Sequence, residues 1–370
     1  MTAIAVPPAL EAAVLAAARE VVGDAALATG PLQRAIADRS ARYTSDRDRL
    51  AKPADRTADL AARAAFFTIA DAMKIAVPLR ELAGRGALPA HRPLRVVDLG
   101  AGCGALSLGL VATLGAESLE LQLIDRDADA LAIARAALAR FAPPARVAIQ
   151  TADVTSAALP PADLVVLGTV LNELPPAARL PLIERALAAL APDGAVIAIE
   201  PALRDTTRAL HELRDAVLAA NRAHVFAPCT RRGAPCPALA DPDDWCHESR
   251  DVVLPPHTAE LARLTHLRDA GLKFSYLVLR RAADSLVSAG GRAWRVVSAP
   301  HAPKGKLELF GCSDAGRITL RLLRRNRSDA NRSFERAARG DVLLVDRAAA
   351  AGDARVEIEA ATTVERITPG

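Results

Sequence analysis

The sequence predicts an α/β protein with a Rossmann-like sheet, an N-terminal helical region and a small C-terminal β-rich module. Three observations predict this class. Apolar strands alternate with helical stretches, a glycine-rich turn follows the first strand, and the last part of the chain alternates apolar and polar residues. We therefore expect helices over 1–90, an α/β domain over 91–282 with a cysteine-rich insertion at 226–256, and the β-rich module over 283–370.

Composition is that of a folded protein, with 51% hydrophobic and 24% charged residues among 370. The net charge of +4 permits nucleic-acid binding but does not require it. We expect no membrane-spanning helix, because charges interrupt every long apolar stretch. The first residues also lack the pattern of a secretory signal. We therefore expect a cytoplasmic protein whose cysteines are free, catalytic or metal-bound rather than paired in disulfides.

Helical periodicity dominates the first 90 residues. Apolar-periodic stretches cover 9–22, 32–42 and 54–82, and Gly23 is expected to end the first of them. Glycines and prolines between residues 84 and 93 then mark a boundary.

From residue 94 the pattern changes to short strands separated by helices. An alternation of this kind predicts a parallel sheet covered by helices on both faces. The expected strands are 95–98, 119–124, 146–150, 163–167 and 195–199, and two of the expected helices are 128–141 and 177–190. Beyond the insertion we expect a helix at 258–270 and a strand at 273–280.

A glycine-rich turn follows the first expected strand. The strand ends at Asp98, and Gly100, Gly102 and Gly104 come before a helix. Glycines let the backbone turn tightly and approach a ligand closely. The helix N-terminus adds free N–H groups and a positive dipole end. The turn therefore predicts a ligand-binding loop.

Two acidic residues end the next two strands. Asp125 lies 25 residues after Gly100, where Rossmann-type sheets bind ribose hydroxyls, and Asp153 is placed to reach an adenine. A dinucleotide such as NAD is the competing ligand, but its fingerprint is G-x-G-x-x-G. The Asp-x-Gly-x-Gly-x-Gly pattern here resembles class I S-adenosylmethionine-dependent methyltransferases. The resemblance implies a cofactor-binding set of six residues: Asp98, Gly100, Gly102, Gly104, Asp125 and Asp153.

The segment after the fourth strand lies, in enzymes of this fold, beside the transferred methyl group. Here it contains Asn172 and Glu173. Either side chain can position a substrate, and capping of the following helix is the alternative. The sequence identifies no general base, so the catalytic residues stay unknown.

Four cysteines other than Cys103 form a possible ligand set: Cys229, Cys236, Cys246 and Cys312. Thiolates bind Zn²⁺ or an iron–sulfur cluster, but the spacing is not that of a zinc ribbon. Spacing alone leaves metal binding and four buried free thiols equally open. A metal would order a segment that is rich in proline and lacks periodicity.

The C-terminal module is basic. Between residues 301 and 341, ten Lys and Arg residues stand against five Asp and Glu. Such a surface can bind phosphates, or it can be a solvated arginine-rich surface. The ten are Lys304, Lys306, Arg317, Arg321, Arg324, Arg325, Arg327, Arg332, Arg336 and Arg339.

Several short segments together resemble the methyltransferase-like proteins of small-ribosomal-subunit assembly in bacteria and mitochondria. Their order and spacing match over roughly 90–345. The segments are Ala227-Pro228-Cys229, Pro235-Cys236-Pro237, Asp244-Trp245-Cys246-His247, Lys273-Phe274-Ser275-Tyr276, Lys304-Gly305-Lys306, Cys312 and Arg339-Gly340-Asp341. The chain departs from the family at Cys229-Thr230-Arg231, often Cys-Pro-His, and at His247-Glu248, often His-Phe.

The resemblance implies a 4Fe-4S cluster on the four cysteines, with zinc as the alternative, and association with the small ribosomal subunit or its rRNA. Three functions are compatible with it. The first is a methyltransferase that modifies small-subunit rRNA with S-adenosylmethionine, mainly by aligning acceptor and methyl group. The second is a non-catalytic assembly factor that keeps the cofactor fold. The third is a small-molecule methyltransferase.

Overall fold

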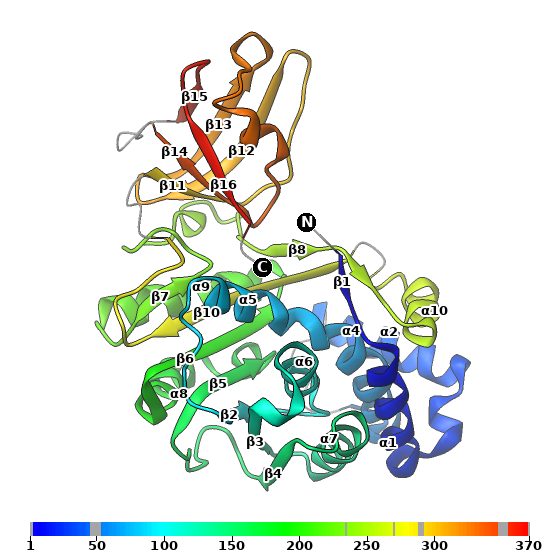
Figure 1. Ribbon diagram of the computed structural model, residues 1–370. Coiled ribbons are helices and arrows are strands. Elements are labelled where there is room, and N and C mark those ends of the chain that lie inside the picture. Colours follow the sequence, from blue (N-terminus) through cyan, green and yellow to red (C-terminus); the bar gives the residue numbers. More distant parts are fainter. Residues whose placement is uncertain are drawn as a thin grey trace.

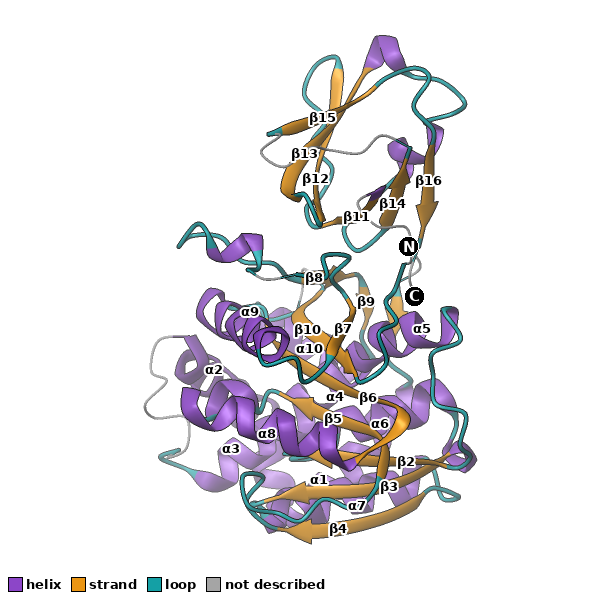
Figure 2. Ribbon diagram, turned by 90° about the vertical axis from the view of Figure 1, so that its left-hand side faces the viewer, coloured by secondary structure: helices purple, strands orange, loops and turns teal. Residues whose placement is uncertain are grey.

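The computed structural model describes residues 3–44, 53–233, 235–268, 271–287, 292–346 and 354–368. It has a large layered α/β part and a smaller β module above it (Figure 1). Figure 2 shows the strands of the β module standing apart from the layered part, with the segment around β8 between the two. The Rossmann-like class, the N-terminal helices and the C-terminal β-rich sheet predicted from the sequence are confirmed.

An eight-stranded sheet forms the centre of the α/β part, in the order β4-β3-β2-β5-β6-β10-β7, with β8 paired to β10. The five strands β4, β3, β2, β5 and β6 are mutually parallel, and β10 runs antiparallel to β6. Chain order reverses between β2 and β5, which is where α/β sheets bind ligands. The strands are β2 (Leu94–Leu99), β3 (Leu119–Asp125), β4 (Arg146–Thr151), β5 (Ala162–Gly168), β6 (Leu190–Pro201), β7 (His224–Ala227), β8 (Glu248–Arg250) and β10 (Leu272–Arg280).

Helices cover both faces of this sheet, because neighbouring residues of its central strands point to opposite sides. Val96 belongs to the core under α6 and α7, whereas Val97 belongs to the core under α8 and α9. The helices are α6 (Ala105–Leu114), α7 (Ala128–Phe141), α8 (Pro176–Ala189) and α9 (Arg204–Ala219).

The N-terminal helices pack on the α6–α7 side of the sheet. They are α1 (Pro8–Leu27), α2 (Thr29–Thr44), α3 (Arg56–Ala62), α4 (Ile69–Asp71) and α5 (Ala76–Gly84). The expected stop at Gly23 is instead a kink within α1, where this residue has a φ of 77°. Strand β1 (Ile4–Ala5) pairs with β9 (Val252–Val253), and α10 (Pro256–Thr265) follows. Helix α10 ends earlier than expected, because His266 takes a left-handed conformation, and residues 269–270 lie outside the described part.

The expected helix over 54–82 is broken in its middle. A π-helical turn at Arg63–Thr68 and a 3₁₀ turn at Ala72–Ile75 interrupt it. Close packing against α6 accompanies the second break, since a Cβ on Gly109 would lie 1.9 Å from the Ala72 carbonyl oxygen. The polar residues Thr68, Asp71 and Lys74 lie in or next to these breaks.

The β module is one six-stranded sheet in the order β15-β13-β12-β11-β14-β16. Trp294, Leu320 and Phe334 are fully buried in its own core. The strands are β11 (Ala293–Val296), β12 (Lys306–Ser313), β13 (Gly316–Leu323), β14 (Val342–Val345), β15 (Arg355–Ile358) and β16 (Val364–Ile367).

Arg295 of β11 joins the module to the α/β part. Its guanidinium donates to Glu81 Oε1 at 2.7 Å, to Glu248 Oε2 at 2.9 Å and to the Tyr276 hydroxyl at 2.9 Å. The tyrosine hydroxyl in turn donates to Glu81 at 2.7 Å. All four side chains are buried, so α5, β8, β10 and β11 meet in one closed polar network.

Candidate functional site

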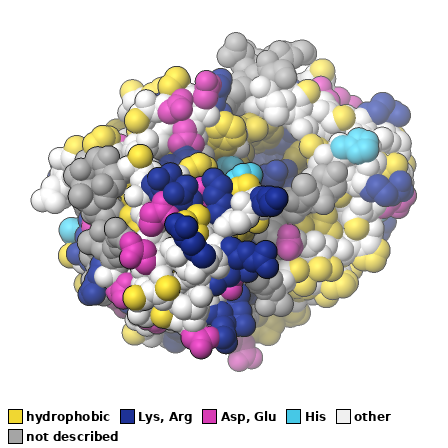
Figure 3. All heavy atoms as spheres, turned by 90° about the horizontal axis from the view of Figure 1, so that it is seen from above, with side chains coloured by type: hydrophobic (Ala, Val, Ile, Leu, Met, Phe, Trp, Pro, Cys, Tyr) yellow, Lys and Arg dark blue, Asp and Glu magenta, His cyan; other side chains and the backbone are white. Residues whose placement is uncertain are grey.

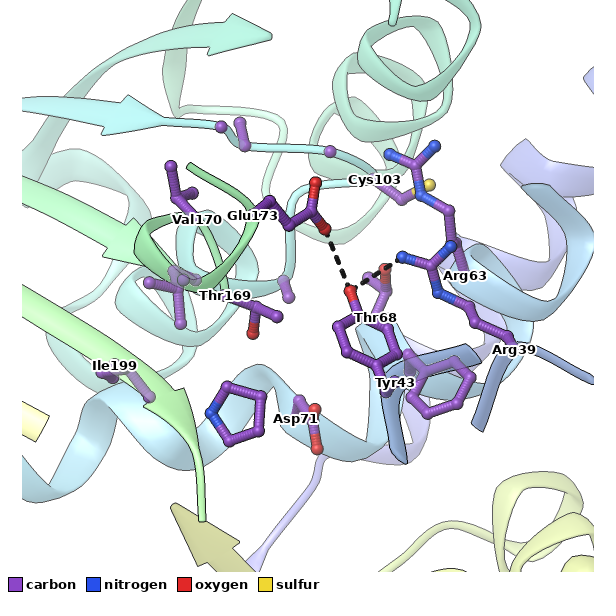
Figure 4. A pocket seen from close by; sticks show the side chains of 18 of the residues that line it. Arg39, Tyr43, Arg63, Thr68, Asp71, Cys103, Thr169, Val170, Glu173 and Ile199 are labelled. Atoms are coloured by element: carbon purple, nitrogen blue, oxygen red, sulfur yellow. Dashed lines mark hydrogen bonds between the residues drawn. The ribbon is translucent and has the colours of Figure 1, made fainter. Parts of the chain in front are cut away.

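A cavity of about 780 Å³ lies between the carboxyl ends of the central strands and the N-terminal helices. Figure 4 shows side chains from both sides pointing toward one another across it. Five of the six predicted cofactor-binding residues line it: Asp98, Gly100, Gly102, Asp125 and Asp153. Gly104 lies just behind the loop, as the residue before α6.

The glycine loop is a tight cradle that side chains would fill. Gly100 has a φ of 73°, and a Cβ there would lie 2.4 Å from Val170 Cγ2. Gly104 has a φ of 87°, and a Cβ there would lie 3.0 Å from Ala134 Cβ. Since such conformations favour glycine, the sequence fixes this loop locally. Because these glycines have no side chains, the loop backbone borders the cavity and can contact a bound ligand directly.

Asp125 ends β3 and connects the loop to the next turn. Its carboxylate accepts hydrogen bonds from the Gly102 and Asp127 backbone N–H groups, both at 2.8 Å. Asp153 follows β4 and accepts from the backbone N–H of Thr155 at 2.8 Å. Hydrogen bonds from Thr155 hold the pKa of Asp153 below its usual value. Both carboxyl groups therefore offer hydrogen-bond acceptors at the cavity wall.

Asp98 is buried beneath the loop. It accepts a hydrogen bond from Ser107 Oγ at 2.6 Å, which ties the end of β2 to the first turns of α6. Burial raises the pKa of Asp98 to about 7. Its contact supports the shape of the loop.

The N-terminal helices supply a wall that the sequence analysis missed. Arg63 pairs with Asp127 at 2.6 Å and lies over Gly102. Arg39 donates to the Tyr43 hydroxyl at 3.0 Å, and that hydroxyl donates to Glu173 Oε1 at 3.1 Å (Figure 4). The last contact joins α2 to the loop after β5, so the helical region closes the cavity.

The same helical wall also carries a buried charge cluster, which includes Asp71 of α4. Arg268 donates to both Asp71 oxygens at 2.8 and 3.0 Å, and Lys74 Nζ lies 2.9 Å from the same carboxylate. Burial lowers the pKa of Lys74 to about 8. Thr169 and Arg268 both have positive φ, at 61° and 65°, which is strained for side chains of these types. Strain of this kind is typical of functional sites.

The side chains of the two polar residues after β5 point in different directions. Asn172 turns away and donates to Glu200 Oε2 at 2.7 Å, whereas Glu173 lines the cavity. Capping of the next helix is wrong for both, because α8 begins after Pro175 without a side-chain cap. Prolines at the start of a helix need no such cap.

The four predicted cysteine ligands lie on different elements. Cys229 follows β7, Cys236 precedes a 3₁₀ turn, Cys246 precedes β8, and Cys312 lies on β12. Burial raises the pKa of Cys312 well above its usual value, and the charges of the other three raise it further. Mutual influence of this kind requires proximity. Within the described ranges, no group of three or more His, Cys, Asp or Glu is arranged to hold a metal ion.

Unpaired nitrogens surround these cysteines. His211 and Arg214 of α9, with Trp245 and His247, each have a buried ring or guanidinium nitrogen without a hydrogen-bond partner. Buried polar nitrogens are normally paired, so each needs an explanation. Nitrogens of this kind can donate hydrogen bonds to negatively charged sulfur atoms. Cys103, by contrast, is buried in the glycine loop.

Comparisons with known proteins place the chain in context. The sequence model of a family described as mitochondrial small ribosomal subunit Rsm22 matches residues 61–353. Carboxy-S-adenosyl-L-methionine synthase of Chromohalobacter salexigens is 35% identical over 124 residues, 32% of this chain and 46% of that protein. Acetylserotonin O-methyltransferase of Mus musculus is 39% identical over 121 residues, 30% of this chain and 29% of that protein. The chain thus spans less than half the length of these curated relatives.

Among solved structures, magnesium protoporphyrin IX methyltransferase of Synechocystis with bound SAM is 14% identical. It covers 66% of this chain and 95% of its own, with a TM-score of 0.38. A putative RNA methyltransferase of Pyrococcus horikoshii is 16% identical, covering 57% of this chain and 84% of its own, with a TM-score of 0.35. In the described part of the chain, no helix has the length and apolar character to cross a membrane.

Proposed function

Because this chain belongs to the mitochondrial small ribosomal subunit Rsm22 family, we propose that it is a methyltransferase-like protein of small-subunit assembly. It binds S-adenosylmethionine in the cavity and the rRNA of the small subunit through its β module. The observation that carries the proposal is the glycine cradle facing Asp125 at the switch point of a parallel sheet. The cytoplasmic location stays a prediction, since the family description names a mitochondrial ribosome.

In this proposal each predicted residue has a role at the cofactor. The backbone of Gly100 and Gly102 borders the methionine moiety, with Gly104 allowing α6 to begin directly behind it. Asp125 accepts from the ribose hydroxyls and Asp153 from the adenine. Asp98 supports the loop through Ser107. Two relatives support the choice of cofactor, one named as a carboxy-S-adenosyl-L-methionine synthase and one named as an O-methyltransferase.

We further propose that Cys229, Cys236, Cys246 and Cys312 hold a 4Fe-4S cluster, with zinc as the alternative. Such a group would link the two parts of the protein, because three of its ligands come from the cysteine-rich insertion and the fourth from β12 of the module. The unpaired nitrogens of His211, Arg214, Trp245 and His247 support the proposal, since they can donate to sulfur. A hydrogen bond already joins the insertion to β12 here, because the Thr230 hydroxyl donates to the Cys312 carbonyl at 2.8 Å.

The β module is the proposed rRNA-binding part. Looking down on it, Figure 3 shows Lys and Arg side chains gathered across the middle of the surface. Arg324 and Arg325 follow β13 and are exposed, and neither forms an ion pair within the described residues. Unpaired surface arginines are suited to phosphates, whose binding releases counterions.

We expect Arg324→Ala/Arg325→Ala to weaken binding to small-subunit rRNA by about 10-fold and to reduce the salt slope by about 2. Filter binding at several salt concentrations measures both values. The matched control is Arg34→Ala/Arg85→Ala, which removes two exposed arginines from the helical region. Equal affinities for all three proteins would contradict the assignment of the module.

Methyl transfer to rRNA is the second candidate function, and the Lys74 amine favours it. Its pKa of about 8 leaves a fraction neutral near pH 7, so it can accept a proton from an acceptor group in the cavity. Immature small subunits incubated with methyl-labelled S-adenosylmethionine test this candidate. Label in rRNA supports an enzyme. Tight binding of cofactor and subunit without label supports the non-catalytic assembly factor, and turnover of free metabolites without subunit binding supports a small-molecule enzyme.

A further inference from the structure

The outer face of the β12–β13 hairpin carries a row of polar and aromatic side chains. Leu307, Leu309, Leu320 and Leu322 point into the module core, so the residues between them point outward. The outward residues are Lys306, Glu308, Phe310 and Cys312 on β12 and Arg317, Thr319 and Arg321 on β13. Strands β12 and β13 run side by side along the module (Figure 1), and the row ends at Cys312 and Arg317.

Phe310 is the unusual member of this row. Its side chain is 46% exposed, and among the described aromatic residues no other falls in the exposed class. The Arg317 guanidinium lies over the ring, 5.2 Å from its centroid. One guanidinium covers only one face of a ring. The exposed part of Phe310 therefore leaves the other face available to a ligand. Burying an aromatic side chain is strongly favourable, so a ring left in water beside a cation suggests a ligand that stacks.

Cations continue this row toward the cavity. Arg317 lies close enough to Arg339 for the two charges to interact, and Arg339 donates to the His247 carbonyl at 3.0 Å. Lys273 lies near enough to His247 for its charge to act on that ring, and it also lines the cavity. The His247 ring itself is stacked with Trp245, 6.3 Å between centroids.

Three acidic side chains along the row are ion-paired, whereas Asp241, close enough to Arg317 for the two charges to interact, has no cation partner within the described residues. Asp244 forms an ion pair with Arg317, and Glu308 lies 2.9 Å from Lys306 Nζ. Glu357, beside Arg321, is paired with that arginine. The face keeps a positive balance through Arg339 and Lys273, for which no carboxylate partner is found within the described residues.

We propose that a single-stranded segment of RNA lies along this face, with one base stacked on Phe310 and its phosphates on Arg317, Arg339 and Lys273. The proposal rests on the proposed rRNA binding and names which RNA is bound and where. A duplex hides the faces of its bases, whereas an unpaired base can stack on an aromatic or guanidinium plane. A protein partner is less suited to this face, because Phe310 is its one exposed apolar side chain among polar neighbours. The strand would lead toward the cavity mouth at Lys273.

The test uses the full-length protein and a short fluorescent single-stranded RNA, with binding followed by anisotropy. Phe310→Ala is expected to weaken binding by about 5-fold or more, because stacking contributes substantially per base. Phe310→Trp is expected to keep or improve affinity, and the salt slope should stay the same in both variants. Affinity for a duplex of the same length should not change. The thermal midpoints show whether the variants are folded.

Unchanged single-strand affinity in Phe310→Ala would overturn the inference. Weaker association with the small subunit at unchanged RNA affinity would also overturn it and would indicate a protein partner. Failure of the proposed function looks different, because the wild-type protein would then bind neither single strands nor subunit rRNA. If Arg324→Ala/Arg325→Ala weakens rRNA binding and Phe310→Ala does not, only the stacking inference fails.

Discussion

Replacing Arg295 with leucine is expected to lower the free energy of unfolding by about 3–5 kcal/mol. Arg295 is buried between two carboxylates, Glu81 and Glu248, which receive hydrogen bonds from it at 2.7 and 2.9 Å. Its loss leaves Glu81 without a cation partner among the described residues, leaves Glu248 with Arg250 alone, and removes a donor to the Tyr276 hydroxyl. Removing one member of a buried ionic network lowers the free energy of unfolding far more than losing an exposed ion pair does.

Urea denaturation followed by circular dichroism measures this loss. The control is Arg222→Leu, whose partner Glu184 lies 3.0 Å away and whose side chain is 62% exposed. We expect that control to stay within about 1 kcal/mol of the wild type. Because Arg295 joins β11 to α5, β8 and β10, limited proteolysis should also cut Arg295→Leu between the β module and the rest. Equal stability of both variants would contradict the network as a structural link.

Replacing Cys312 with serine is expected to abolish metal binding altogether. Cys312 comes from β12, whereas the other three proposed ligands come from the insertion before β8, so no neighbouring cysteine can take its place. Protein purified without oxygen should absorb visible light and contain about 4 Fe per chain, as expected for a 4Fe-4S cluster. Cys312→Ser should be colourless, while Cys103→Ser should keep the cluster because that thiol lies in the glycine loop.

Two other outcomes have clear meanings. A colourless wild type with one zinc per chain would replace the cluster by the zinc alternative and leave the ligand set intact. A metal-free wild type in which all four thiols react with an alkylating reagent would contradict the ligand set. Circular dichroism of Cys312→Ser shows whether loss of metal also reflects loss of fold.

The sequence was most informative where local chemistry determines structure. Gly100 and Gly104 have positive φ values, which glycine adopts without strain, so the loop was recognisable from residue type and spacing. Strand ends place Asp125 and Asp153 at one edge of the sheet, since parallel strands share their direction. The cysteines were recognisable because thiols are rare in this chain.

Other features depend on distant contacts and left no local signal. Arg39, Tyr43 and Arg63 resemble any polar residues of a solvated helix until the chain folds them over the cavity. The breaks within the expected helix at 54–82 accompany packing against Gly109 of α6, more than 30 residues away in the sequence. Helix α9, which the sequence analysis did not single out, supplies His211 and Arg214 beside the cysteine ligands.

Calorimetric titration with S-adenosylmethionine tests the central claim most directly. The wild type is expected to bind one molecule per chain, and Asp125→Ala should bind at least about 10-fold more weakly, because hydrogen bonds to a charged group contribute about 1.5–3 kcal/mol. Asp129→Ala, which removes an exposed carboxylate from the first turn of α7, should bind like the wild type. Saturable binding that depends on Asp125 would establish the cavity as the cofactor site. No binding, or equal binding by Asp125→Ala, would contradict the account.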